Sequence, residues 1–146
     1  MANAIFNAAK GHIATNATWS NLGVILVDST FSLDIDAQED LADVSGDRIT
    51  GSNGGDKTGI TGTWTVDDAN DRAELTLAAQ TWSALGDPTP GTECGGAIVY
   101  DNNPASDADK TLLCFIDTVT GFSFPFTPNG SDFTLTFPSE GLIQLA

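Results

Sequence analysis

Short blocks of alternating apolar and polar residues run along most of this chain, and that pattern is typical of β-strands. The longest apolar block, residues 22–27, is continuous and rich in β-branched residues, so we expect a central strand covered on both faces. In residues 60–66, apolar and glycine positions alternate with threonine, and after a turn at residues 67–71 the alternation returns at residues 73–77. These two segments predict a hairpin.

Further strands are expected in the second half of the chain. Residues 97–100 and 112–116 are short apolar runs separated by a polar loop that contains Asn103-Pro104, and they are expected to pair. Residues 133–137 alternate between apolar and polar positions, and residues 142–145 predict a last strand.

Three regions depart from the strand pattern. Residues 2–10 carry good helix formers, with apolar residues spaced for one face, and predict a short N-terminal helix. Residues 31–44 mix acidic and apolar residues and predict a polar excursion with one helical turn. The glycine-rich residues 51–55 predict a loop tip.

The number of strands defines the fold class. About seven or eight short strands, separated by turn signals and with almost no long helical pattern, predict an all-β protein. We expect an antiparallel β-sandwich or a jelly-roll-like barrel with a short N-terminal helix. The 146 residues fit a single domain, residues 1–146, because no linker or internal repeat divides them.

Composition narrows the range of partners. The formal net charge is −15, from 20 acidic residues against 5 Lys and Arg. Such a chain repels phosphate backbones and anionic lipid, so we expect neither nucleic acid nor membrane as a partner. The sequence contains no signal-peptide pattern and no apolar run of about 18 residues that would predict a membrane span.

The two cysteines, Cys94 and Cys114, allow two interpretations. If residues 97–100 and 112–116 form a hairpin, Cys114 lies near Ala97 and about one cross-strand pair from Cys94, so a disulfide is possible. Without a secretory context, free and buried thiols are the expected state.

The chemistry needed for catalysis is sparse. The one histidine, His12, follows the expected helix, where a helix C-terminus favours a cation. The chain contains no nucleophile elbow, no Cys-His motif and no zinc-ligand spacing. We therefore expect no enzyme activity, no cofactor and no metal.

Acidic residues gather at two expected turns, where aspartate is common for conformational reasons. These groups are Asp67, Asp68 and Asp71, and then Asp101, Asp107 and Asp109. Calcium binding and acid-catalysed hydrolysis by a carboxyl pair remain open as alternatives, although the twelve-residue calcium loop is absent and a catalytic carboxyl needs a partly buried, apolar setting.

Aromatic residues give two candidate surfaces. Trp64 and Trp82 are expected in the core, Trp19 is undetermined, and exposed tryptophans would instead indicate a glycan-binding module. Phe122, Phe124 and Phe126 alternate around Pro125, which places their segment at an edge or a bend. Together with Phe133 and Phe137 they exceed what one core of this size is expected to bury, so we expect these three phenylalanines at an interface with another subunit.

Four segments carry a resemblance to a known group of proteins. They are Leu-Gly-Val-Ile-Leu-Val-Asp-Ser at residues 22–29, Asp-Asp-Ala-Asn-Asp-Arg-Ala at residues 67–73, Ala-Ile-Val-Tyr-Asp at residues 97–101 and Gly-Leu-Ile-Gln-Leu at residues 141–145. In order and texture, over nearly the whole chain, they resemble small virion structural proteins of tailed bacteriophages.

The resemblance implies a capsid cement or decoration protein that binds the major capsid protein at junctions between its subunits. Such a protein would lie on the outer surface of the virion, and in the host cytoplasm before assembly. A position on local threefold axes implies a homotrimer. A neck, tail or fibre-base component is the alternative role within the same group.

Overall fold

The structure, a computed structural model, describes residues 4–6, 19–87, 91, 93–119, 121–139 and 141–145. Almost all of the described elements are short strands in antiparallel sheets, which confirms the all-β class. Helix is limited in the described residues to two 3-10 turns, η1 (Leu41–Val44) and η2 (Asp107–Asp109). The first of these confirms the helical turn expected in residues 31–44. The described residues contain no helix that could span a membrane.

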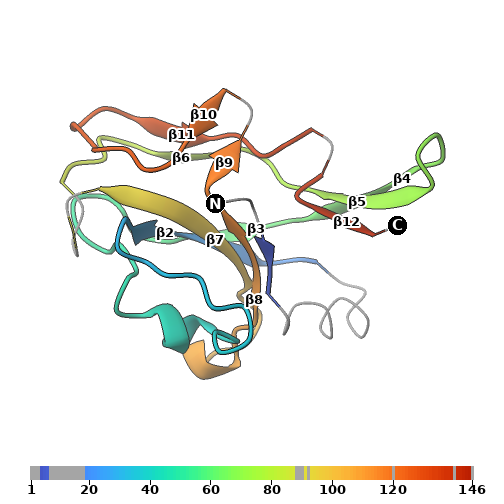
Figure 1. The fold of residues 1–146 in the computed structure, drawn as a ribbon, viewed down its shortest axis with the longest axis horizontal. Coiled ribbons are helices and arrows are strands. Elements are labelled where there is room, and N and C mark those ends of the chain that lie inside the picture. Colours follow the sequence, from blue (N-terminus) through green and yellow to red (C-terminus); the bar gives the residue numbers. More distant parts are fainter. Residues whose placement is uncertain are drawn as a thin grey trace.

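A five-stranded antiparallel sheet is the centre of the fold (Figure 1). Its strands, in spatial order, are β1 (Ala4–Ile5), β8 (Leu112–Ile116), β7 (Cys94–Asp101), β2 (Leu22–Asp28) and β3 (Lys57–Ile60). All seven residues of β2 are buried, which confirms the covered strand predicted from its continuous apolar run. The expected pairing of β7 with β8 is also confirmed.

Three small sheets lie along one side of the large sheet in Figure 1. They are β10 (Phe122–Ser123) with β9 (Thr118–Val119), β11 (Phe133–Leu135) with β6 (Gln80–Trp82), and β12 (Ile143–Leu145) with β5 (Arg72–Thr76) and β4 (Thr63–Asp67). The described strands therefore form one large sheet faced by separate small sheets, and a sandwich of two continuous sheets is not confirmed.

The chain passes from the large sheet to a small one at Gly62. Residues 60–66 were expected to form one strand, but the structure divides them between β3 and β4. A Cβ added to Gly62 would lie 2.8 Å from Leu75 Cδ1 and 3.1 Å from Leu22 Cδ1. Glycine at this crossing therefore lets side chains of both sheets meet. The predicted hairpin of β4 with β5 is confirmed, but its Val66 is 75% exposed instead of facing the core.

The predicted N-terminal helix is wrong at Ala4–Ile5, where the structure has β1. Ala4 and Ile5 pair with Phe115 and Cys114 on the edge of β8. The open backbone groups of that edge provide hydrogen bonds that a local helical preference does not anticipate, and Phe6 is fully buried next to them. The other positions of the expected helix, and His12, lie outside the described residues.

The register of β7 with β8 shows that the two cysteines are too far apart to form a disulfide. Cys114 pairs with Val99 and not with Ala97 as expected, while Cys94 pairs with Asp28 and bridges to Phe126. Cys94 and Val99 are five positions apart along an extended strand, or about 16 Å, well beyond the reach of a disulfide. Both thiols are free and buried.

Candidate interaction surface

Four aromatic rings gather where the small sheets β9–β10 and β6–β11 meet. We call them the phenylalanine cluster: Phe122, Phe124, Phe126 and Phe133. Every pair among the four is in contact, with ring centroids between 4.4 and 6.1 Å apart. All four side chains are partly buried, so the cluster rests on the core and keeps part of its apolar surface accessible.

The backbone of the cluster is fixed to the large sheet. Phe126 and Cys94 exchange two hydrogen bonds, of 2.9 and 3.0 Å, and the Phe124 amide donates to the Asp117 carbonyl at 2.9 Å. The Phe124–Pro125 peptide bond is cis. The three hydrogen bonds hold the segment beside β7, and the chain bends at Phe124, next to the Pro125 from which an edge or a bend was predicted. The structure brings the three expected interface residues together and adds Phe133 from β11, whereas Phe137, which is only 7% exposed, belongs to the core.

A cavity of about 210 Å³ opens beside the cluster. Its apolar wall includes Leu85, Phe126 and Phe133, and its polar rim includes Asn129, Ser131 and Asp132. The sequence does not predict this cavity, because it forms where the loop before β11 meets the turn after β6, 40 or more residues away along the chain.

Hydrogen bonds hold the walls of this cavity in place. Leu85 donates its amide to the Ser131 carbonyl at 3.0 Å and accepts from the Gly130 amide at 2.8 Å. The Ala84 amide donates to Asp132 Oδ1 at 2.8 Å, and the Ser131 amide donates to Asn129 Oδ1 at 3.1 Å. The cavity is therefore a formed feature of the fold.

The tryptophans lie mostly inside the protein. Trp82 is fully buried, as expected, and stacks on Phe133 with 5.8 Å between ring centroids. Trp19 is 6% exposed and packs edge-on against the partly buried Trp64 at 5.8 Å. Because these rings face the interior, they do not provide the exposed aromatic platform that a glycan-binding module uses.

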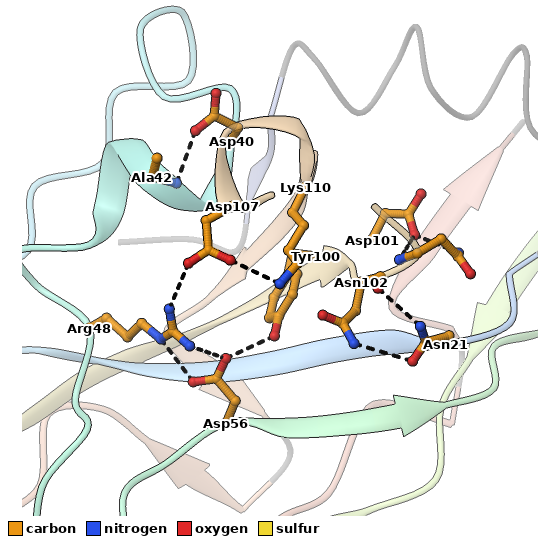
Figure 2. Close-up of polar contacts among 11 residues, drawn as sticks. Asn21, Asp40, Ala42, Arg48, Asp56, Tyr100, Asp101, Asn102, Asp107 and Lys110 are labelled. Carbon is orange, nitrogen blue, oxygen red and sulfur yellow. Dashed lines mark hydrogen bonds and ion pairs between the residues drawn. The ribbon is translucent and has the colours of Figure 1, made fainter. Parts of the chain in front are cut away.

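A polar network joins β7, η2 and the loop before β3 (Figure 2). Asp56 accepts hydrogen bonds from Arg48 and from the Tyr100 hydroxyl, the latter at 2.8 Å. Asp107 pairs with Arg48 at 3.2 Å and with Lys110 at 2.8 Å. Burial, followed by the charge of Asp56, raises the pKa of Tyr100 above its ordinary value. Each charged group in this network has an opposite partner, which indicates a structural role.

Burial raises the pKa values of both cysteine thiols and of one carboxyl group. Burial raises the pKa of Cys94 to about 12 and raises the pKa of Cys114 as well, so neither thiol is nucleophilic at neutral pH. Burial and the nearby Asp28 raise the pKa of Asp47, but Asp47 does not line the cavity beside the cluster. Among the described residues, no group of His, Cys, Asp and Glu could hold a metal ion.

Two aspartates of the second expected turn, Asp101 and Asp107, bond to other groups of the protein, whereas the side chain of Asp109 is exposed. Asp101 is buried and accepts from the Asn103 amide at 2.9 Å, and Asp107 lies in the network above. This is the turn chemistry that the sequence predicts. Asp68 and Asp71 lie in the turn of the β4–β5 hairpin.

Comparisons of the chain with protein-family models, with curated proteins and with solved structures gave no match.

Proposed function

We propose that this chain is a virion structural protein of the capsid cement or decoration type, which binds at junctions of the major capsid protein on the outer surface of the head. The observation that supports this proposal is the phenylalanine cluster, a partly exposed group of aromatic rings on a backbone that is hydrogen-bonded to Cys94 and Asp117. Aromatic anchors supply a large share of binding energy at protein interfaces.

Charge supports the same role. A net charge of −15 keeps a small protein soluble in the host cytoplasm before assembly and away from the packaged genome. A cement protein needs no catalytic group, and the buried thiols and paired carboxylates agree with a protein that acts by binding alone. The homotrimer follows from the proposed position on a local threefold axis.

The test uses particles that lack the protein, to which purified wild type and Phe124→Ala are added back. Phe124→Ala removes a ring of the cluster and should weaken particle binding about 30-fold or more, the effect of losing about 2 kcal/mol of contact energy. Val66→Ala is the matched control, because Val66 is 75% exposed and lies on β4, outside the cluster. It should bind like the wild type.

Circular dichroism and sedimentation complete the experiment. The Phe124→Ala spectrum should match that of the wild type, and the wild type should sediment as a trimer. If Phe124→Ala unfolds, Phe124 belongs to the core and the interface assignment is wrong. If the wild type stays monomeric and binds no particle, the cement role fails. Binding at a neck or tail position would favour the alternative role in the same virion.

A further inference from the structure

The cavity beside the phenylalanine cluster combines three properties that define its ligand: size, aromatic walls and one carboxylate. At about 210 Å³ it exceeds the roughly 150 Å³ that accommodates a benzene ring in an engineered protein cavity. It has space for one large side chain. Phe126 and Phe133 face each other's rings at 4.4 Å and contribute aromatic surface to its wall.

Asp132 supplies the carboxylate at the rim. Its side chain is exposed, and its Oδ1 accepts the Ala84 amide at 2.8 Å, which fixes the orientation of the carboxylate. Within the described part of the chain nothing bonds Asp132 Oδ2. An oriented carboxylate beside aromatic faces is a favourable environment for a cation.

The protein's own described cations are committed elsewhere. Arg48 and Lys110 belong to the network of Figure 2, and Arg72 pairs with Glu74 at 2.7 Å. Lys57 lies 5.5 Å above the ring of Trp82, the ring that stacks on Phe133. Trp82, which stacks on the phenylalanine cluster, thus already contacts one cation of its own chain. None of the four cationic side chains lines the cavity beside the cluster.

We infer that this cavity receives an arginine side chain from a basic segment of the partner protein, with the guanidinium stacked on Phe126 or Phe133 and paired with Asp132. The inference rests on the proposed function and identifies the chemistry of the partner surface. Arginine fits better than lysine, because its planar guanidinium stacks on aromatic rings and forms directed bonds to a carboxylate. The net charge of −15 attracts such a segment over a distance.

A second copy of the chain fits this cavity poorly. Its four described cations are engaged in the contacts above, and two copies that each carry −15 repel one another. The contacts of the proposed trimer are therefore expected on other surfaces.

The test probe is Nα-acetyl-arginine methylamide, titrated into the isotope-labelled protein and followed by NMR. The methyl signals of Leu85 and the ring signals of Phe126 and Phe133 should shift and saturate, with Kd on the order of 1 mM, since a ligand of this size gains little binding energy. Nα-acetyl-citrulline methylamide has nearly the same shape without the charge. The same signals should show that it binds with a Kd at least tenfold higher.

Asp132→Asn isolates the carboxylate, because the amide oxygen retains the bond from Ala84. We expect this variant to lose about tenfold in affinity for the arginine probe. Asp68→Asn, an equal charge change in the exposed turn of the β4–β5 hairpin, should leave it unchanged. Equal responses to arginine and citrulline, no response to either, or an unaffected Asp132→Asn would each overturn the inference.

Particle binding separates this inference from the proposed function. If Phe124→Ala loses particle binding and Asp132→Asn keeps it, the cement role stands and the arginine contact is wrong. If sedimentation shows that Asp132→Asn dissociates the protein's own oligomer, the cavity binds a second copy and the stated partner chemistry is wrong. Loss of particle binding in both variants supports both the cement role and the arginine contact.

Discussion

Gly23 shows how a single position can fix the packing of the large sheet. It pairs with Tyr100 across β2 and β7, and a Cβ added to it would lie 2.1 Å from Cζ of the tyrosine ring. The ring cannot readily move away from an added Cβ, because Tyr100 is fully buried and its hydroxyl donates to Asp56. Only glycine leaves the tyrosine room to reach the ion-pair network.

Gly23→Ala should therefore lower the free energy of unfolding by about 1–3 kcal/mol, the ordinary cost of overpacking a core. Urea denaturation followed by tryptophan fluorescence measures this change. Gly46→Ala is the control, since a Cβ at Gly46 has no atom within 4 Å, and it should change stability by less than about 0.5 kcal/mol. Equal effects of the two substitutions would show that the contact with Tyr100 does not limit position 23.

Among the elements, η1 and η2 are joined at their ends by backbone contacts, and ion pairs hold η2 in place. The Leu41 amide donates to the Lys110 carbonyl at 3.0 Å, and the backbones of Asp40 and Thr111 form an isolated antiparallel β-bridge. Asp107 of η2 adds its ion pairs with Arg48 and Lys110. The hydrogen bond from Lys110 is the main reason that the pKa of Asp107 lies below its ordinary value.

Asp107→Asn should lower the urea midpoint at pH 7 by an amount equivalent to less than about 1 kcal/mol, because Asp107 is 43% exposed and its ion pairs are screened by solvent. A carboxyl whose pKa is lowered by folding stabilises the protein above its ordinary pKa of 3.8, and this contribution is lost as the pH falls through the lower folded value. The difference between wild type and variant should therefore shrink towards pH 3.

Asp109→Asn provides the control on the same 3-10 turn, because the side chain of Asp109 is exposed. It should have little effect at either pH. A difference for Asp107→Asn that persists undiminished at pH 3 would mean that packing, and not charge, holds η2 in place.

The sequence predicts those elements whose pattern is local. The continuous apolar run of β2 and the alternation of β4 and β5 needed no knowledge of distant contacts. β1 could not be predicted, because its strand conformation depends on pairing with β8 more than 100 residues later. The division between β3 and β4 likewise depends on Leu22 and Leu75 meeting around Gly62.

The candidate surface was likewise predicted only where its pattern is local. Alternation and Pro125 indicated Phe122, Phe124 and Phe126 as one edge group, and the structure brings their rings into contact. Phe133 and the cavity were not predicted as part of it. They join the surface only because β11 pairs with β6, and no pattern within either strand specifies that partner.

At the scale of the whole molecule, the aromatic surface and the charge act together. An excess of acidic residues disfavours random contact between copies of the chain, while the phenylalanine cluster provides one place where burial of apolar surface favours contact with the proposed partner. This combination suits a protein that stays soluble alone and binds tightly only where many copies of a partner have assembled.

Electron cryomicroscopy of the assembled particle would show whether the protein lies on the capsid. We expect density for this β-fold on the outer surface of the head, at junctions of the major capsid protein, with Phe122, Phe124 and Phe126 covered by the neighbouring subunit. A particle that contains the protein but leaves the phenylalanine cluster facing solvent, or a purified virion from which the protein is absent, would contradict it.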